Sequence, residues 1–266
     1  RQSTGAAATS WTEMSHFRPW RALALVVSAA LIAGALHHAR EDARWLLVPA
    51  AALVGLAISF GLRALGQRRV RRMLVEGRAE ELLQHWHDSL VALPHADTTV
   101  PLLHATALAA SGHTVRARAA LDHAARGKSW PAAHEHRLLI ETLLDAFEGE
   151  PGAALSKAQA LSELPLPELP NDLRVRVALL RESVAAVARA FAHQPEARDA
   201  NLLRQAAGRN ALIHWPLRYA AAVVCIDQGE RAAARELLAD APAWPEDSAF
   251  RAFHAELSAY AREPRD

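Results

Sequence analysis

Two charged, alanine-rich stretches far apart in the chain share one pattern: SGHTVRARAALDHAARG at residues 111–127 and DQGERAAARELLADAPAWP at residues 227–245. In both stretches a small or apolar residue stands five, nine and twelve positions after a glycine, Gly112 or Gly229. Each glycine is therefore expected in a turn between two helices, whose small residues mark where the two backbones pack closely. The residues at these offsets are Ala117, Leu121 and Ala124 in the first stretch, and Ala234, Leu238 and Ala241 in the second.

Two weaker copies of the pattern occur in the same chain. Gly149 is followed by Ala154, Ala158 and Leu161 at the same three offsets, and Gly77 is followed by Leu82 and Trp86 at the first two. Prolines follow each copy, and because proline cannot continue a helix, they are expected to end the second helix of each pair. Gly149 and Gly229 are 80 residues apart, which predicts two further irregular helical pairs between them, built from residues 171–193 and 196–212.

The repeated unit resembles the tetratricopeptide (TPR) repeat, a helix–turn–helix of about 34 residues with small residues at such positions. Gly112 and Gly149 lie 37 residues apart, close to that period, and the resemblance covers roughly residues 72–260. The chain departs from the family at its first conserved positions, where Pro101 and Ala105 stand. The resemblance implies an α-solenoid of antiparallel helix pairs over residues 67–262, and a single four-helix bundle is the structural alternative.

The composition also predicts an all-α fold. Among 266 residues there are only 12 glycines and 14 prolines, and β-branched and aromatic residues are too few for a sheet protein. A formal net charge of +1 gives no argument for nucleic-acid binding, so no nucleic-acid partner is expected. The single cysteine, Cys225, cannot form an internal disulfide and stands in an apolar run, which favours a buried structural thiol.

Two apolar stretches near the start of the chain predict a transmembrane helical hairpin over residues 20–66. Residues 22–36 are apolar or small, and residues 45–62 carry no charge, so spans are expected at about 20–38 and 45–65. A cleaved signal peptide is the alternative for the first stretch, and a buried core helix is the alternative for the second. Residues 1–19 are expected to be disordered or non-native and 263–266 to form a tail. Small residues four apart within the spans offer faces for homo-oligomer formation.

An arginine run follows the second predicted span directly. Because cytoplasmic flanks are enriched in Lys and Arg, the run places the remaining chain in the cytoplasm, on the inner side of a bacterial inner membrane. The run also suggests contact with anionic lipid headgroups. Its members are Arg68, Arg69, Arg71 and Arg72.

This layout of two spans, a basic run and a TPR-like region is similar to that of the HemY-type envelope proteins of bacteria. The sequence therefore predicts a membrane-tethered cytoplasmic scaffold or adaptor that binds partner proteins and is not an enzyme. The alternative that the HemY-type likeness implies is a protein that handles haem or porphyrin at the membrane. A stack of helix pairs has a concave groove, and the residues expected to face it supply no basic clamp, which favours an apolar partner helix or a groove filled by the protein's own helices. The candidate partner-binding residues are Thr99, Thr106, His136, Leu139 and Tyr219.

Catalytic and metal-binding patterns are not evident. His134 and His136 are two residues apart, so on a helix they point in nearly opposite directions and cannot share an ion. Glu141 and Asp145 fall on a predicted helix with arginines nearby, which is typical of a solvated helix face. The chain has no glycine-rich phosphate loop and no glycine-flanked nucleophile. No catalytic residue, metal ligand or cofactor is therefore expected.

Overall fold

The computed structural model describes residues 68–78, 81–84 and 95–262, and within these ranges all regular secondary structure is helical. The chain divides into two compact units, residues 1–69 and 70–266, and the labelled helices all belong to the second. This confirms the prediction of an all-α fold for the described part. The predicted spans and the segment 1–19 lie outside it, as does the tail 263–266. No helix among the described residues is both long and apolar enough to cross a bilayer.

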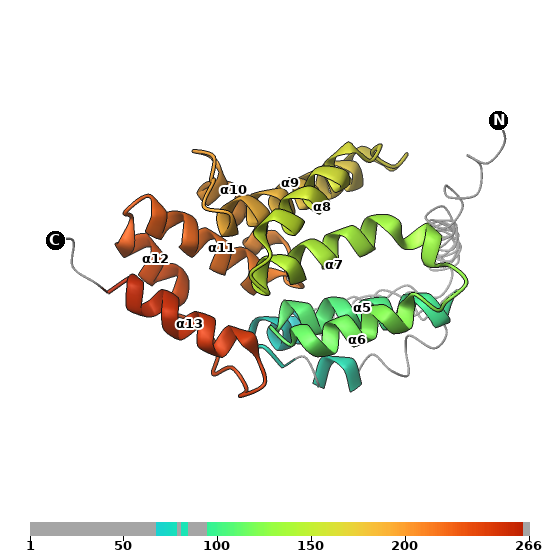
Figure 1. The fold of residues 1–266 in the computed structure, drawn as a ribbon, viewed down its shortest axis with the longest axis horizontal. Coiled ribbons are helices and arrows are strands. Elements are labelled where there is room, and N and C mark those ends of the chain that lie inside the picture. Colours follow the sequence, from blue (N-terminus) through green and yellow to red (C-terminus); the bar gives the residue numbers. More distant parts are fainter. Residues whose placement is uncertain (1–67, 79–80, 85–94, 263–266) are drawn as a thin grey trace, which may run out of the picture. The chain divides into compact units, whose positions relative to one another are not determined.

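Short turns join the helices of the second unit (Figure 1). Residues 68–75 are helical and precede the labelled elements, as does a turn of helix at 81–84; residues 70–75 of the first of these belong to the second unit. The labelled helices are α5 (Ala96–Ala110), α6 (Thr114–Ala124), the 3-10 helix η3 (Trp130–Ala133), α7 (His134–Phe147), α8 (Pro151–Glu163), α9 (Asn171–Phe191), α10 (Asp199–Arg209), α11 (His214–Asp227), α12 (Arg231–Leu238) and α13 (Ala249–Tyr260).

Consecutive helices pack as pairs, and each pair contacts the next. The pairs are α5 with α6, α7 with α8, α9 with α10, and α11 with α12. The first helix of each pair also packs on the first helix of the neighbouring pair, so α7 lies between α5 and α9, and α9 between α7 and α11. The second helix of a pair contacts the first helix of the following pair, as α8 does with α9 and α10 with α11. Each helix is thus buried mainly by helices close to it in sequence.

The turn within each pair has one recurring geometry. Gly77, Gly112, Gly149 and Gly229 all have positive φ angles, between 69° and 82°. In each case the next residue's N–H donates to the carbonyl five positions earlier, as from His113 to Leu108 at 2.9 Å. This six-residue closure ends a helix by satisfying an orphan carbonyl, and it requires the left-handed backbone that glycine adopts without strain. The turns expected at the four glycines are therefore present.

A fifth turn of the same kind is centred on His193, which the sequence pattern did not reveal. His193 has a φ of 54°, and the N–H of Gln194 donates to the carbonyl of Arg189 at 2.9 Å. The left-handed residues are thus 35, 37, 44 and 36 residues apart along the chain. The prediction of two helical pairs between Gly149 and Gly229 is wrong, because one pair, α9 and α10, fills that interval.

Most of the small residues that follow each turn glycine lie in the core; Ala241 is partly buried and follows the end of α12. Ala117, Ala124, Ala154 and Ala234 are fully buried, and Leu121 and Leu238 are each 5% exposed. Ala158 and Leu161 are buried as well, and Cys225 is inaccessible, as expected for a structural thiol. Alanine at these positions lets the two helices of a pair approach closely, because its side chain occupies little of the space between the backbones.

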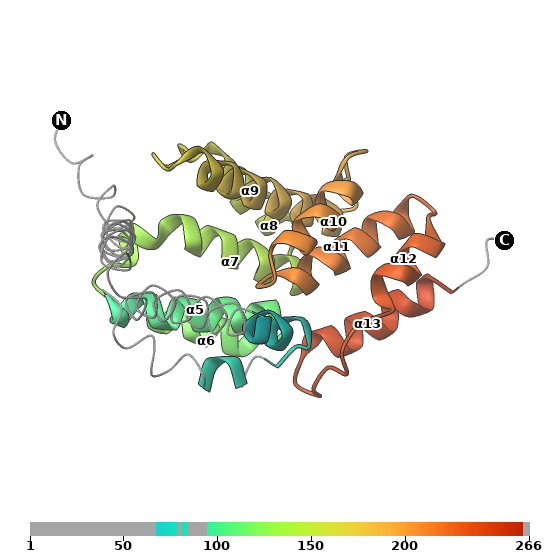
Figure 2. The ribbon, with the colours of Figure 1, turned by 180° about the vertical axis from the view of Figure 1, so that it is seen from behind.

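The C-terminal helix α13 packs back on the turn of the first labelled pair (Figure 2). The N–H of Ala249 donates to the carbonyl of Gly112 at 2.9 Å, and the hydroxyl of Ser248 donates to the carbonyl of Ser111 at 2.8 Å. Phe250 is fully buried beside this turn. Residues 137 positions apart are thus joined, and α5 also contacts α11.

Gly112 and Gly149 form a matched pair for testing this closure. A Cβ at Gly112 would lie 2.6 Å from the Ser248 hydroxyl and 2.7 Å from the Phe250 ring, whereas a Cβ at Gly149 would meet nothing within 4 Å. Both alanine variants strain a left-handed residue, which costs about 1 kcal/mol, and only Gly112→Ala also overfills the core, at a further cost of about 1–3 kcal/mol. We expect chemical denaturation to show a clearly larger loss of unfolding free energy for Gly112→Ala. Equal losses would contradict the described contact between α13 and the turn.

Candidate functional site

The residues predicted to face an open groove are largely buried. Tyr219 is inaccessible, Thr106 is 2% exposed and Leu139 is 8% exposed. Thr99 and His136 are half-buried. A side chain without accessible surface cannot contact a partner, so the prediction that Tyr219, Thr106 and Leu139 line an open groove is wrong for this structure.

Aromatic side chains of the chain itself fill the space around Tyr219. The indole N–H of Trp244 donates to the Tyr219 hydroxyl at 2.6 Å, and the rings of Phe250 and Phe253 from α13 lie 5.1 and 5.5 Å from the Tyr219 ring. Phe253 also contacts Phe147 at the end of α7, with ring centroids 5.5 Å apart. Burial raises the pKa of the Tyr219 phenol. Of the two possibilities that the sequence left for the groove, an apolar partner helix or the protein's own helices, the second describes the surroundings of Tyr219.

His136 is held as a neutral residue between α7 and α5. The Thr106 hydroxyl donates its one proton to the carbonyl of Leu102 at 2.8 Å, so the Nε2–H of His136 donates to the Thr106 oxygen, also at 2.8 Å. Burial lowers the pKa of His136 to about 4, although the nearby Glu135 opposes the shift. His134 is exposed, so the two histidines point in different directions.

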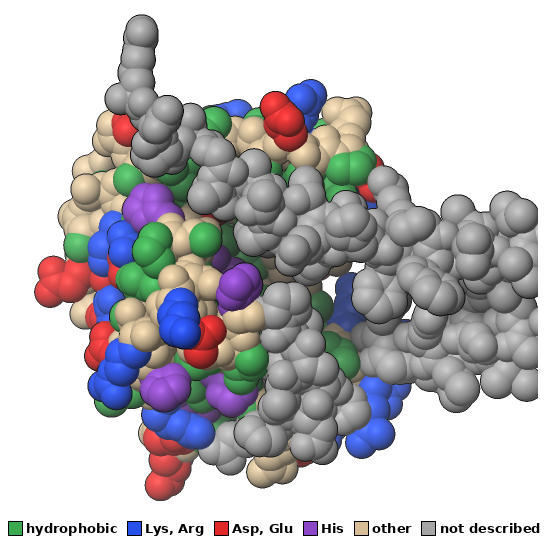
Figure 3. All heavy atoms as spheres, turned by 90° about the vertical axis from the view of Figure 1, so that its right-hand side faces the viewer, with side chains coloured by type: hydrophobic (Ala, Val, Ile, Leu, Met, Phe, Trp, Pro, Cys, Tyr) green, Lys and Arg blue, Asp and Glu red, His purple; other side chains and the backbone are tan. Residues whose placement is uncertain are grey.

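Histidines are prominent on the face of the domain shown in Figure 3, where they are mixed with side chains of both charges. Within the ranges that the structure describes, no group of three His, Cys, Asp or Glu side chains could hold a metal ion.

Protonation of His136 is expected to destabilise the fold. Because the folded-state pKa is about 4 and the unfolded value is about 6.5, the unfolded chain binds the extra proton first. The contribution of neutral His136 to the unfolding free energy is complete above pH 6.5. It falls by about 2–3 kcal/mol as the pH drops to 4. We expect His136→Gln, which keeps a donor to Thr106 but does not titrate, to show a flatter pH dependence of unfolding free energy over this range. His134→Gln is the control and should keep the wild-type slope; a wild-type slope in His136→Gln would contradict the buried neutral state.

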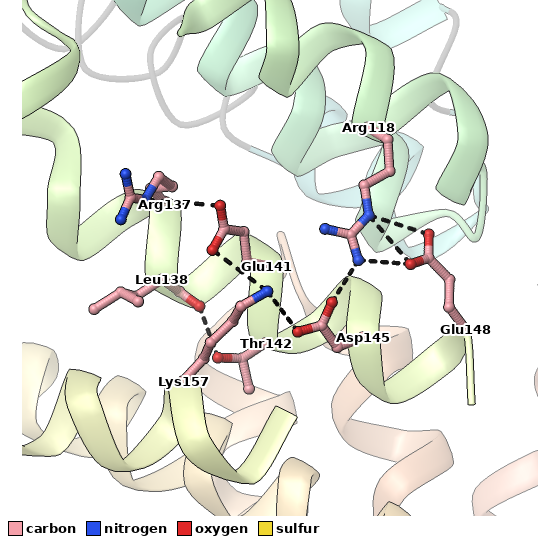
Figure 4. A network of polar contacts seen from close by, with 8 residues as sticks. All are labelled: Arg118, Arg137, Leu138, Glu141, Thr142, Asp145, Glu148 and Lys157. Carbon is pink, nitrogen blue, oxygen red and sulfur yellow. Dashed lines mark hydrogen bonds and ion pairs between the residues drawn. The ribbon is translucent and has the colours of Figure 1, made fainter. Parts of the chain in front are cut away.

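A network of charged side chains joins α6, α7 and α8 (Figure 4). Asp145 on α7 is at its centre: its carboxylate oxygens lie 2.5 Å from Arg118 Nη2 on α6 and 2.7 Å from Lys157 Nζ on α8. Arg118 also binds Glu148 at 2.6 Å, and Lys157 lies 3.5 Å from Glu141. Burial lowers the pKa of Arg118, but the hydrogen bonds to Glu148 and Asp145 raise it overall, so the guanidinium stays charged.

The network joins three helices at one of the repeated turns. Asp145 is only 6% exposed at its side chain, so the interpretation of this carboxylate as part of a solvated helix face is wrong. Each of its oxygens lies within ion-pair distance of a cation, one of Arg118 and the other of Lys157. Asp145 also occupies the position four residues before Gly149, where its carbonyl accepts the closing hydrogen bond of the turn. The ion pairs therefore fix three helices at one of the repeated turns.

Removal of the Asp145 carboxylate is expected to weaken this junction. Asp145→Ala leaves Arg118 and Lys157, each about one third exposed, without their shared partner, and we expect a loss of about 1–3 kcal/mol in unfolding free energy. Glu141→Ala on the same helix removes only contacts of 3.5 Å and 3.7 Å and serves as the control, with an expected loss below about 1 kcal/mol. Equal losses in thermal or urea unfolding would show that the network is not centred on Asp145.

The arginines of the predicted lipid-facing run are all at the surface. Arg68, Arg69, Arg71 and Arg72 are each exposed. Arg71 and Arg72 belong to the helical segment 70–75, which is part of the second unit. Their accessibility permits contact with headgroups, and the contact itself stays a prediction.

An apolar surface that sequence reasoning missed lies between α8 and α9. Of the five large hydrophobic side chains that are exposed in the described ranges, three are within ten residues of one another: Leu166 at 45%, Leu173 at 39% and Val175 at 54%. All six residues from 171 to 176 are exposed, so the start of α9 is surrounded by solvent on all sides. We call Leu166, Leu173 and Val175 the α8–α9 surface. Leu173 and Val175 are two residues apart on α9 and so lie on nearly opposite sides of the helix, which means that a partner contacting both would have to surround the start of α9.

Buried Arg181 holds the loop that carries this surface. Its guanidinium donates to the carbonyl of Leu164 at 2.6 Å and to that of Pro165 at 3.2 Å, and it also binds Glu135 on α7 at 2.9 Å. The loop is therefore fixed to α7 and α9, so an incoming partner would meet an ordered surface. The alternation of leucine with proline in LPLPELP at 164–170 was the available sequence signal, since such a segment cannot be helical throughout.

Comparison with known proteins yielded no relative: no protein family, curated protein or solved structure matches the chain. The function is therefore argued from the residues and their arrangement.

Proposed function

We propose that the protein is a membrane-tethered, non-catalytic scaffold whose cytoplasmic part is a TPR-like α-solenoid that binds partner proteins. The observation that supports this most strongly is the turn that recurs at Gly77, Gly112, Gly149, His193 and Gly229. One supersecondary unit repeated at intervals of 35 to 44 residues is the construction of helical repeat proteins, which commonly serve as binding surfaces.

The packing of the pairs supports the same proposal. In a solenoid each repeat is buried by its neighbours, and the described helices contact their sequence neighbours in that way. The described helices differ from an open solenoid at the inner face. There, α13 and the aromatic cluster around Tyr219 fill the space in which an open solenoid would bind a partner. Partner contact is therefore assigned to the outside of the stack, at the α8–α9 surface.

The membrane tether is supported by the sequence before the second unit. The apolar stretches 22–36 and 45–62 have lengths near those that a bilayer requires, and the arginine run follows the second stretch directly. Under the positive-inside rule this order places the helical unit in the cytoplasm of a bacterial cell, next to the inner membrane. The tether would keep any bound partner at that surface.

A pair of valine substitutions tests the partner surface. Val175 on α9 and Val115 on α6 are both exposed, at 54% and 82%, so glutamate at either position should leave folding intact. Burying a charge in an apolar contact costs far more free energy than placing a charge on a surface that no partner covers. In affinity purification of the tagged full chain from its native membrane, we expect Val175→Glu to lower recovery of the co-purifying partner about tenfold or more.

The control is Val115→Glu, which should recover the partner as the wild type does. Thermal unfolding of both variants should match that of the wild type. If both variants retained the partner, the α8–α9 surface would not be its docking site, and if neither the wild type nor any variant recovered a stoichiometric protein, the scaffold function itself would fail.

A further inference from the structure

The helical segment 70–75 is fixed against the junction of α10 and α11. The indole N–H of Trp215, a fully buried residue of α11, donates to the carbonyl of Val75 at 2.6 Å. Near the other end of the segment, Arg71 Nη2 donates to the carbonyl of Gly208 on α10 at 3.4 Å. The end of the arginine run is thus an integral part of the folded unit.

This placement brings the C-terminal end of α10, where Arg209 stands, against the run. Arg209 follows Gly208, whose carbonyl Arg71 contacts, and it is the last residue of α10. Arg71, Arg72 and Arg209 are all exposed, and we call these three residues the arginine patch. In the part of the chain that the structure describes, none of the three has an ion pair with a carboxylate, whereas Arg78, a few residues further on, pairs with both Glu76 and Glu81.

His214 lies near Arg71 of the patch and near Arg218. The imidazole Nδ1–H donates to the carbonyl of Ala207 at 2.9 Å. Burial lowers the pKa of His214, the hydrogen bond to Ala207 opposes this, and Arg218 and Arg71 lower the pKa further. The charge of Arg218 is partly neutralised, because its guanidinium lies 3.8 Å from the Asp240 carboxylate and donates to the carbonyl of Glu236. Arg218 is therefore not counted among the arginines of the patch.

We propose that the arginine patch binds the phosphate groups of an anionic phospholipid bilayer and thereby docks the helical unit on the membrane in one orientation. Arginine suits this ligand because its guanidinium forms paired hydrogen bonds to phosphate oxygens and is always charged. The inference rests on the proposed function, since it takes the membrane surface from the tether. It adds a residue from the folded unit, Arg209, that the arginine run alone does not contain.

Chain connectivity favours a bilayer as the occupant. Arg71 stands only nine positions after Leu62, the end of the second apolar stretch. Nine residues span at most about 30 Å when fully extended and about 14 Å as a helix, so the patch stays near the headgroups of the membrane into which that stretch inserts. Each arginine near an anionic surface raises binding about fivefold. Three arginines without an ion pair among the described residues therefore favour the docked orientation by about a hundredfold.

The test places the full chain in lipid nanodiscs and measures fluorescence energy transfer from the helical unit to the bilayer surface. Cys225 is buried, so a cysteine at exposed Gln205, one turn before Arg209, takes a donor fluorophore selectively. The acceptor is a headgroup-labelled lipid in discs of phosphatidylcholine, with or without about one third phosphatidylglycerol. We expect higher transfer in the anionic discs, and the increase should disappear in 0.5 M salt because screening weakens the attraction.

Two double variants identify the residues responsible. Arg72→Glu with Arg209→Glu should reduce the transfer in anionic discs to the level of neutral discs. Arg174→Glu with Arg176→Glu makes the same change in net charge on α9, where both arginines are exposed, and should keep the increase. Equal transfer in the two kinds of disc for the wild type, or equal loss in the two double variants, would overturn the proposal.

Two further outcomes separate this inference from its premise and from other anions. If alkaline carbonate strips the chain from neutral discs, the tether and with it the proposed function fail, whereas a retained chain without lipid-dependent transfer overturns only the docking. A wild-type chain that binds a short DNA duplex through the patch and ignores phosphatidylglycerol would also overturn it, by assigning the patch to nucleic acid.

Discussion

The structure depends on one backbone constraint, a left-handed residue that ends the first helix of each pair. In this turn the N–H of the following residue reaches back five positions to a helical carbonyl, for example from Glu150 to Asp145 at 2.8 Å. The bond reverses the chain within three residues, so the second helix has to lie against the first. Small residues such as Ala154 then permit close contact, and the pairs stack because each buries its apolar face on the next.

The constraint also explains where polar and aromatic residues are concentrated. Asp145 supplies the carbonyl for one turn and, through its carboxylate, holds Arg118 and Lys157 on the flanking helices. At Gly112 the exposed edge of the turn is covered by α13, which brings Phe250 into the core. The space around Tyr219 is consequently a closed aromatic core, and the exposed side chains lie on the outside of the helices.

The candidate sites were only partly predictable from sequence. The arginine run is visible in the sequence, but Arg209 joins it only because Trp215 and Gly208 fix the segment 70–75 on α10 and α11. Tyr219 has the spacing of a residue on an inner helix face, and periodicity cannot show that Trp244 and Phe250 cover it. The α8–α9 surface was missed because Leu173 and Val175 alternate with arginines, and a period of two does not show which residues of a helix are exposed.

The sequence by itself determined the all-α class and four of the turns, because a glycine with small residues at fixed offsets encodes a local backbone geometry. It did not reveal the turn at His193, where a histidine takes the left-handed conformation and α10 starts only at Asp199, so both the glycine signal and the offsets are lost. Tertiary structure alone decided that α13 closes on Gly112, that Asp145 is buried and that Arg209 lies beside Arg71. These contacts join residues far apart in the chain, and their geometry depends on the sum of all the intervening turns and helix lengths, which no local pattern contains.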